Sequence, residues 1–348
     1  MPQMLSKAAV KACIAGEPTP IVPAWRFWTD NQFRQTYPDD MIAFKERWCD
    51  DFHIIEVEPR KRPMDPPYDS LEPLEIMDHW NCIFAESPDG VGWHPTRPIV
   101  RTVDEWERYK AEGLPELTDS FGAAIVKSTT ETPDEYALGT CWRTYYERMF
   151  MLMGYEDLMM EIATEGELFM AMREDLFQFT LRAIDMIADA GADGVYLADD
   201  WGTQHRLMIS PTHFAKYFKP HYGAMIELAH SRGLEVWMHS CGQITESIPH
   251  WIDIKLDVLS NLQALALDLP AIAETYRGQI CFMGGLDVQE NLVKGTPATV
   301  RAEVEKVFSD FHAAEGKYIA SPCNTIMPET PIENVWALFE AFDAVGRY

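Results

Sequence analysis

Positive charge is scarce in this sequence. Lysine and arginine number 29 against 55 aspartate and glutamate residues, which gives a formal net charge of −26. A surface this acidic repels the phosphate backbone of nucleic acids. The glycine-rich phosphate motifs GxGxxG and GxxxxGK[ST] are also missing. We therefore do not expect nucleic acid to be a partner.

Disulfide patterns and membrane-spanning runs are missing as well. The seven cysteines are an odd number with no Cys-x-x-Cys pair, which argues against a disulfide framework and favours a reducing cytoplasm. No stretch of about 18 apolar residues would span a bilayer. Residues 1–20 lack the uninterrupted apolar segment of a secretion signal. We expect a cytoplasmic protein without a membrane partner.

The composition of the chain is that of a globular protein with one large hydrophobic core. Hydrophobic residues make up 47% and charged residues 24% of the 348 positions, which is typical of globular domains. Short β-branched or aromatic runs alternate with helical stripes, the pattern of repeated strand-helix units. The expected strands span 21–27, 52–58, 122–128, 194–200, 235–240, 258–263, 280–286 and 317–323. The expected helices of the C-terminal half span 210–232, 246–253, 268–277, about 300–311 and about 335–342.

Eight strands joined by helices favour an α/β fold of the (β/α)8 TIM-barrel type. We expect a single barrel domain over residues 1–348. The segment 60–118 breaks the rhythm, because it is rich in proline, tryptophan and charge. We predict that it is an insertion covering one face of the barrel, as a lid or an interface.

Polar residues end the predicted strands, where α/β barrels carry their reacting groups. They are Glu56, Glu58, Asp199, Asp200, His239, Cys241, Asn261, Gln263, Asp287 and Cys323. Polar strand tips are common in barrel enzymes, so the joint pattern carries more weight than any one residue.

The sharpest motif is His239-Ser240-Cys241. Residues two apart on a strand point to the same side, so the imidazole and the thiolate face one spot. Cys323 ends a strand two units later. One nitrogen and two sulfurs suit zinc, and three protein ligands leave a fourth position open for water or substrate. Spacing alone also allows a buried histidine beside a packed cysteine, with Cys323 unrelated.

The acidic pair Asp199-Asp200 is a candidate for acid chemistry. Two adjacent carboxylates in a dry pocket resist joint ionisation, so one is expected to stay protonated as an acid. Neighbours on a strand point to opposite faces, so only one enters a pocket unless the strand has already ended. The alternative is a pair that caps a helix or orders a loop.

Several large side chains near the strand tips predict an aromatic-lined pocket. Many tryptophans are simply core residues, and that interpretation stays open. The predicted substrate contacts are Trp25, Trp28, Trp201, Gln204, Trp237 and Gln263.

The segment from ADDWGTQHR to LEVWMHSCGQI, with MGGLDVQENLVKG, SPCNTI and IENVWALFEAF further on, resembles the uroporphyrinogen decarboxylase-like superfamily. The resemblance covers about residues 190–345 and, more weakly, VPAWRFWTDNQFRQTY near the start. The decarboxylases of this superfamily carry two loop arginines that bind porphyrinogen carboxylates. Here those positions fall on Trp28 and Gln32, which argues against tetrapyrrole decarboxylation.

The other branch comprises zinc-dependent methyltransferases linked to corrinoids. Their metal motif, His-x-Cys with a distant second Cys, is similar to His239, Cys241 and Cys323. The resemblance therefore implies zinc on these three residues. The run Asp-Asp-x-Gly-Thr-Gln looks like the relatives that demethylate methyl ethers. No cobalamin-binding Asp-x-His-x-x-Gly motif is present, so the corrinoid (cobalamin) is expected on a partner protein.

From this resemblance we expect a methyltransferase that demethylates a methoxylated, aromatic small molecule and passes the methyl group to the cobalt of that corrinoid protein. Asp199 or Asp200 would supply the proton to the leaving oxygen. One alternative is transfer from a methyl-corrinoid protein to a thiol such as coenzyme M. Another is a decarboxylase like the founding members. A third is a non-catalytic zinc or corrinoid-docking module.

Overall fold

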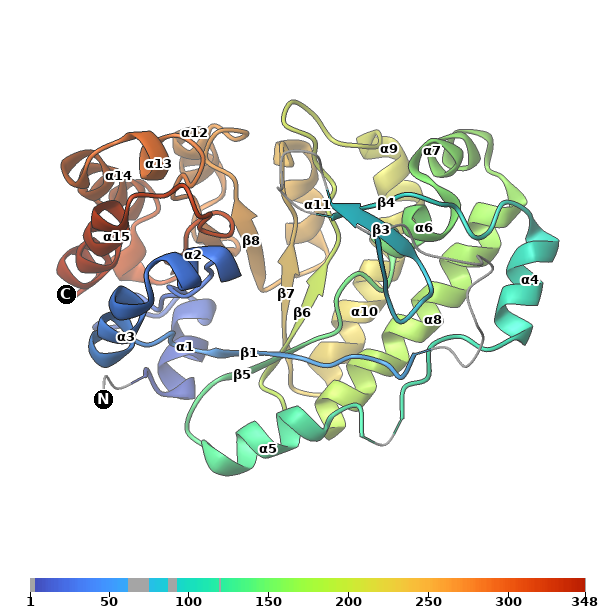
Figure 1. Ribbon diagram of the computed structural model, residues 1–348, viewed down its shortest axis with the longest axis horizontal. Coiled ribbons are helices and arrows are strands. Elements are labelled where there is room, and N and C mark those ends of the chain that lie inside the picture. The colour runs from blue at the N-terminus through green and yellow to red at the C-terminus, as the bar shows by residue number, and fades with distance from the viewer. Residues whose placement is uncertain (1–3, 62–74, 87–92, 119, 348) are drawn as a thin grey trace.

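The computed structural model describes residues 4–61, 75–86, 93–118 and 120–347. Its centre is a curved sheet of parallel strands in the order β1-β5-β6-β7-β8-β9-β10. Helices surround the sheet, and the N-terminal helices lie beside the C-terminal ones (Figure 1). The strands are β1 (His53–Glu56), β5 (Ala137–Thr140), β6 (Gly194–Ala198), β7 (Glu235–His239), β8 (Val258–Leu262), β9 (Cys281–Gly284) and β10 (Tyr318–Ile319).

The helices follow the strands along the chain. In the N-terminal part they are α1 (Lys7–Ala15), α2 (Asn31–Thr36), α3 (Pro38–Arg47), α4 (Val103–Ala111), α5 (Ala123–Glu131), α6 (Tyr146–Met153), α7 (Tyr155–Thr164) and α8 (Glu167–Asp189). In the C-terminal part they are α9 (Pro211–His213), α10 (Lys219–Ser231), α11 (Ile248–Asp253), α12 (Leu269–Tyr276), α13 (Asn291–Lys294), α14 (Pro297–Asp310) and α15 (Ile332–Val345). The π-helix η1 (Phe214–Phe218) and the short 3-10 helices η2 (Thr245–Ser247) and η3 (Ala313–Glu315) complete the set.

Most of the C-terminal half agrees with the sequence prediction. The helix predicted over 210–232 is present as α9, η1 and α10, and Ser210 caps it by accepting a hydrogen bond from the backbone of His213. Pro211 takes the first helical position, where its missing N–H costs nothing. Gly233 follows the helix with φ +79°, a conformation that favours glycine.

The strand predicted at 122–128 is wrong. Those residues lie in α5, and the strand beside β1 is β5 instead. The short apolar run before Lys127 has no periodicity that separates helix from strand. Gly139 weakens the strand signal of β5, yet a Cβ there would lie 2.7 Å from Ile187 and 2.8 Å from Ile125. The glycine therefore lets α5 and α8 pack closely on the sheet.

Residues 22–29 connect the two ends of the sheet. Trp25 donates its backbone N–H to the carbonyl of Ala320 at 2.8 Å, and Ala24 accepts from the N–H of Asp51 at 2.9 Å. The strand predicted at 21–27 is thus present only as isolated bridges, an antiparallel one from Ile21 to Arg347 and a parallel one from Ala24 to Ala320, rather than as a regular strand. The predicted α/β class is confirmed, and the fold is TIM-barrel-like.

The segment 60–118 contains a separate antiparallel sheet of β2 (Glu75–Met77), β3 (Ile83–Glu86) and β4 (Trp93–Pro95), followed by α4. This sheet is not hydrogen-bonded to the main one. Residues 62–74 and 87–92 lie outside the described residues. The insertion over one face and the single domain over 1–348 therefore stay predictions.

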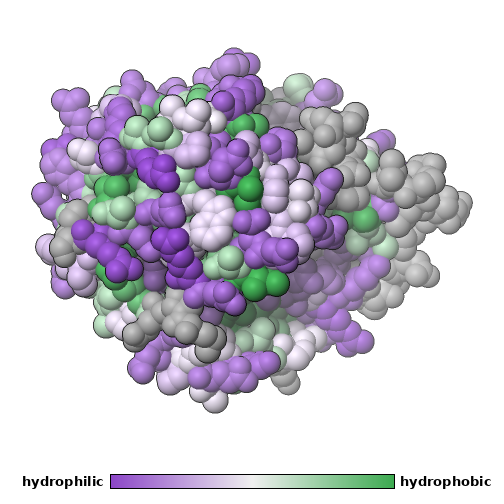
Figure 2. Space-filling view, turned by 60° about the vertical axis from the view of Figure 1, so that its left-hand side comes forward, coloured by the Kyte–Doolittle hydropathy of each residue, from purple (hydrophilic) through white to green (hydrophobic). Residues whose placement is uncertain are grey.

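Hydrophilic side chains dominate one face of the molecule, where hydrophobic patches are small and separated (Figure 2). This agrees with the acidic composition. Among the described residues, no helix has both the length and the apolar character needed to cross a bilayer.

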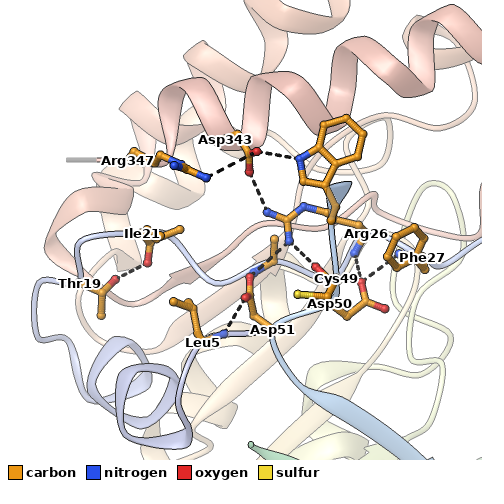
Figure 3. A network of polar contacts seen from close by, with 12 residues as sticks. Leu5, Thr19, Ile21, Arg26, Phe27, Cys49, Asp50, Asp51, Asp343 and Arg347 are labelled. Atoms are coloured by element: carbon orange, nitrogen blue, oxygen red, sulfur yellow. Dashed lines mark hydrogen bonds and ion pairs between the residues drawn. The ribbon is translucent and has the colours of Figure 1, made fainter. Parts of the chain in front are cut away.

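A buried arginine anchors the segment that connects the sheet ends. Arg26 is only 5% exposed. Its guanidinium donates to the carbonyl of Cys49 at 2.7 Å and contacts the carboxylates of Asp51 and Asp343, each at 3.3 Å (Figure 3). Asp51 also accepts from the backbone N–H of Ala24 at 2.9 Å. One cation therefore ties residues 22–29 to the start of β1 and to α15.

We expect Arg26→Met to destabilise the fold by about 3 kcal/mol, because it leaves the buried carboxylate of Asp51 without its cation. The measurement is the denaturant midpoint of unfolding. The matched control is Arg301→Gln, which breaks an exposed ion pair with Glu340 and should cost less than about 1 kcal/mol. Equal losses in the two variants would contradict the anchoring role of Arg26.

Candidate active site

A cavity of about 440 Å³ opens at the C-terminal ends of the strands. This is the face where TIM-barrel enzymes place their active sites. Two further cavities, of about 560 and 240 Å³, share Glu56 and Trp142 with it. The lining residues of the first cavity are Trp28, Glu56, Trp142, Arg143, Glu147, Ala198, Asp200, His239, Cys241, Asn324 and Thr325.

Three side chains of the types that can bind a metal ion meet in this cavity. His239 Nε2 lies 3.4 Å from Cys241 Sγ and 3.5 Å from Asp200 Oδ1. One ligand atom from each residue lies within 4.8 Å of the other two. Both neighbours approach the same nitrogen, whereas a Cys-His-Asp relay uses the two ring nitrogens separately. The arrangement therefore resembles a ligand set more than a nucleophile with its base.

Two glycines bring these side chains together. Asp200 follows β6 and Cys241 follows β7, and the loops after them touch. A Cβ on Gly242 would lie 2.4 Å from the carbonyl of Gly202. Gly242 also has φ +82°, which favours glycine. The close approach lets the N–H of Cys241 donate to Asp200 Oδ1 at 2.8 Å.

The electrostatics of the cluster follow from burial and proximity. Burial alone would lower the pKa of His239, but the charges of Cys241 and Tyr196, together with hydrogen bonds to Asp200 and Cys241, raise it well above its usual value. Burial would raise the pKa of Asp200, but His239 and the N–H of Cys241 bring it below its usual value. Burial raises the pKa of the Cys241 thiol. These contacts favour the ionised form of Asp200.

Asp199 points away from this cluster. Its carboxylate accepts from the backbone N–H of Glu147 at 2.7 Å and from the hydroxyl of Tyr222 at 2.5 Å. Burial raises the pKa of Asp199 to about 6. Of the two carboxylates predicted as catalytic, only Asp200 lines the cavity. Asp199 instead fixes the first turn of α6.

Cys323 lies close to the site but outside the cluster. Its side chain is buried. Burial raises the pKa of this thiol to about 12. The next residue, Asn324, lines the cavity, and its Nδ2 donates to Cys241 Sγ at 3.5 Å. The structure therefore brings His239 and Cys241 together, and the predicted role of Cys323 stays a prediction.

Two of the four predicted tryptophans reach the cavities. Trp28 lines the first cavity and packs edge-to-face with His239, with ring centroids 5.9 Å apart. Trp25 stacks on Trp28 at 4.4 Å and lines the adjoining cavity. Trp201 and Trp237 are fully buried in the core.

The two glutamines predicted as substrate contacts join neighbouring loops. Gln263 accepts from the N–H of Gly242 at 2.9 Å and donates to Gln204 at 3.2 Å. Gln204 in turn donates to the carbonyl of Leu265 at 3.0 Å. Neither glutamine lines the described cavities. Their contact with a substrate remains a prediction.

The sequence analysis missed three residues after β5. Trp142, Arg143 and Glu147 all line the cavity. Glu147 is buried, and desolvation together with the charge of Asp200 raises its pKa to about 8. The strand wrongly predicted at 122–128 left β5 unrecognised. Candidate residues were predicted at the ends of strands, so the residues after β5 were not among them. A strand over Ala137–Thr140 would have placed them at a tip.

Comparisons with known proteins agree with this architecture. A family model described as uroporphyrinogen decarboxylase (URO-D) matches residues 86–345. A methyltransferase from Methanosarcina mazei has a similar structure, with a TM-score of 0.67, 17% identity and coverage of 98% of this chain and 99% of that one. A B12-independent methionine synthase from Shewanella sp. W3-18-1 is less similar, with a TM-score of 0.46, 13% identity and coverage of 66% and 67%. No curated protein matches the sequence significantly. At these identities the structural likeness concerns the fold.

The titration of Glu147 gives a testable pH dependence. Its pKa is about 8 in the folded protein against 4.5 for an unperturbed glutamate. Between these values the folded state binds more protons than the unfolded state, so stability falls as the pH rises through that window. We expect Glu147→Gln to remove the contribution of Glu147 to this loss of stability with rising pH. Its stability relative to the wild type should therefore be greater near pH 9 than near pH 5, measured by urea unfolding of the metal-free protein.

The control for this titration is Glu165→Gln, which changes an exposed glutamate paired with Lys216. Infrared spectra give a second readout, because a protonated carboxyl band should be present near pH 6, disappear above about pH 9 and be missing in the E147Q variant. If the stability of the wild type and of E147Q changed in parallel with pH, Glu147 would be ionised over the whole pH range.

Proposed function

Because the chain belongs to the uroporphyrinogen decarboxylase family, we propose that it is a zinc-dependent methyltransferase working in the barrel cavity. It demethylates a methoxylated aromatic compound and passes the methyl group to the cobalt of a corrinoid protein. The observation that carries the proposal is the convergence of His239, Cys241 and Asp200 beside a buried, protonated Glu147. The similar fold of a known methyltransferase supports it.

The donor groups of the cavity suit zinc. An imidazole nitrogen, a thiol sulfur and a carboxylate oxygen are its usual ligands, and their atoms lie within 4.8 Å of one another. His239 and Cys241 would hold the ion, with either Cys323 or Asp200 as the third ligand. Zinc bound there supplies a Lewis acid for the oxygen that leaves when the methyl group is transferred.

The aromatic wall provides room for a flat substrate. Trp28 and Trp142 both form T-shaped ring contacts with His239, at 5.9 and 6.2 Å between centroids. Indole surfaces favour stacked or edge contacts with another aromatic ring. A methoxyarene packed there places its methoxy group near the donor cluster, while Arg143 stands on the same cavity wall.

Protonation of the leaving oxygen falls to Glu147 in this scheme. The methyl-oxygen bond breaks as the methyl carbon bonds to the corrinoid cobalt, and the resulting phenolate takes a proton. Asp200 is ionised, and both oxygens of Asp199 already accept hydrogen bonds. Glu147 is protonated at neutral pH because its pKa is about 8. The donor role predicted for the aspartates therefore moves to Glu147.

The lining also argues against the decarboxylase alternative. A porphyrinogen carries several carboxylates that need cations. Trp28, at one predicted arginine position, forms an aromatic wall, and Gln32, at the other, is exposed on α2. Among the described residues that line the first cavity, Arg143 is the only lysine or arginine.

The direct test incubates the zinc-loaded protein with methoxyarenes and a reduced corrinoid protein. We expect equal amounts of phenol and methyl-cobalt corrinoid, followed by chromatography and by the visible spectrum of the corrinoid. A folded, zinc-containing protein that transfers methyl only from methyl-cobalt to a thiol would overturn the proposed direction. Release of carbon dioxide from a carboxylated substrate would point to the decarboxylase alternative.

We expect Glu147→Gln to lower kcat about 100-fold with methoxyarenes, because a glutamine cannot deliver the proton. The zinc content should stay unchanged, since Glu147 is not a proposed ligand. The loss should be smaller for substrates whose phenolates are more stable, because they need the proton less. Glu165→Gln is the control and should keep wild-type activity. If E147Q retains full kcat on every substrate, the donor lies elsewhere.

A further inference from the structure

The first cavity and the cavity of about 240 Å³ meet at one cationic side chain, because Arg143 lines both of them. We propose that Arg143 binds a carboxylate of the substrate, so that the compound demethylated here is a methoxylated aromatic acid rather than a neutral methoxyarene. This inference rests on the proposed function and names the substrate class within it. It follows from the position of the guanidinium, from the contacts that fix its backbone and from the charges around it.

The backbone of Arg143 has a conformation that few side chains adopt. Its φ is +56°, in the left-handed region. A residue other than glycine persists there only where the surrounding structure fixes it, and such positions are common at binding and catalytic sites. Arg148 Nε supplies one fixing contact, because it donates to the carbonyl of Arg143 at 3.0 Å. The turn after β5 is therefore held in place where Arg143 enters the two cavities.

The small antiparallel sheet holds Arg148 in turn. Arg148 is buried and forms an ion pair with Asp78 at 2.5 Å. The carbon at the centre of its guanidinium lies 4.9 Å from the centroid of the Trp80 ring. Asp78 and Trp80 lie between β2 and β3, and Asp78 accepts the N–H of Trp80 at 2.9 Å. The sheet of β2, β3 and β4 therefore contributes to the site by fixing the arginine that supports Arg143.

The charge of Arg143 is available to a ligand. Among the described residues its guanidinium makes no hydrogen bond, and its one ion-pair contact is from Nε to the carboxyl group of Glu147 at 3.9 Å. That partner is neutral at pH 7, because the pKa of Glu147 is raised to about 8. The side chain of Arg143 is half exposed. Arg148 also lines the 240 Å³ cavity, but its charge is already paired with Asp78.

A carboxylate on an aromatic ring fits this position. A guanidinium offers parallel N–H donors that match both oxygens of a carboxylate, and such charge-assisted hydrogen bonds are strong. Trp142 lines both cavities and contacts His239, so a ring packed on this tryptophan reaches the donor cluster and the 240 Å³ cavity together. Arg143 and Glu147 are neighbours. The methoxy oxygen and the carboxylate should therefore be close on the ring, as they are in a meta isomer.

Glu56 is the opposing charge at the junction. It lines all three cavities. Burial and the charge of Glu58 raise its pKa, whereas the charge of Arg143 lowers it. An ionised Glu56 repels a bound carboxylate but not a neutral analogue. Removal of Arg143 and removal of the Glu56 charge should therefore change the preference for an acid in opposite directions.

The test uses isothermal titration calorimetry to compare 3-methoxybenzoate with its neutral analogue 3-methoxybenzamide on the zinc-loaded protein. We expect the wild type to bind the acid about 10-fold more tightly than the amide. Arg143→Met should abolish this preference, Arg143→Lys should keep part of it, and Glu56→Gln should increase it. Methionine and lysine meet the same backbone conformation as arginine, so the comparison isolates the head group. Arg301→Gln, which changes an exposed arginine paired with Glu340, is the control and should keep the preference.

The same two compounds are then assayed as substrates with a reduced corrinoid protein, and kcat/KM should show the same preference and its loss in R143M. Circular dichroism shows whether each variant is folded, and R143K carries the comparison if R143M is not. The inference is overturned if a folded R143M binds the acid as tightly as the wild type does, or if the wild type does not prefer the acid; demethylation of either compound would still support the proposed function. Binding of the acid that depends on Arg143, without any methyl transfer, would support the anion site and overturn the proposed function instead.

Discussion

The fold depends on how the two ends of a curved parallel sheet are joined. Residues 22–29 do this with a few backbone hydrogen bonds to the strands on either side, too few to fix the segment by themselves. The buried guanidinium of Arg26 supplies the rest, because its partners come from the start of β1 and from α15. A buried cation with two carboxylates fixes one geometry, since any displacement leaves charges without partners. Trp25 and Trp28 lie on this segment, so the aromatic wall of the cavity takes its position from the same anchor.

The sequence predicted most accurately the strand-helix units that repeat along the chain. The helices after residue 190 have clear N-cap residues, terminating glycines and apolar faces, as Ser210 and Gly233 illustrate. The predicted bounds of the strands and helices in this half lie close to those in the structure. Local patterns failed where tertiary packing decides the outcome. Gly139 looks like a strand breaker, but it is there because α5 and α8 approach the strand closely. That one misassignment also concealed Glu147, whose raised pKa depends on burial that no local pattern reports.

The candidate site likewise combines features that local sequence patterns predict with features that only tertiary packing decides. The motif His-Ser-Cys predicted that the side chains of His239 and Cys241 would lie together, and they do, because strand periodicity fixes side chains two apart on one side. The adjacent aspartates could not be told apart from sequence, since their roles depend on partners far along the chain. Tyr222 and the N–H of Glu147 engage Asp199, whereas the N–H of Cys241 orients Asp200. Packing of the tryptophans was likewise beyond the sequence, because core and cavity positions share the same strand tips.

Cleavage of a methyl ether in a cavity requires an acid that is protonated at rest and a stable anion afterwards. Burial keeps the proton on Glu147 in the resting protein, and the charge of Asp200 adds to that effect. The anion left behind has two sources of stabilisation. Glu147 lies in the first turn of α6, where the helix dipole favours negative charge, and Arg143 Nε lies 3.9 Å from its carboxylate. Asp199 holds the backbone of Glu147 in that turn, so the carboxylate that does not enter the cavity still determines where the carboxyl group of Glu147 lies.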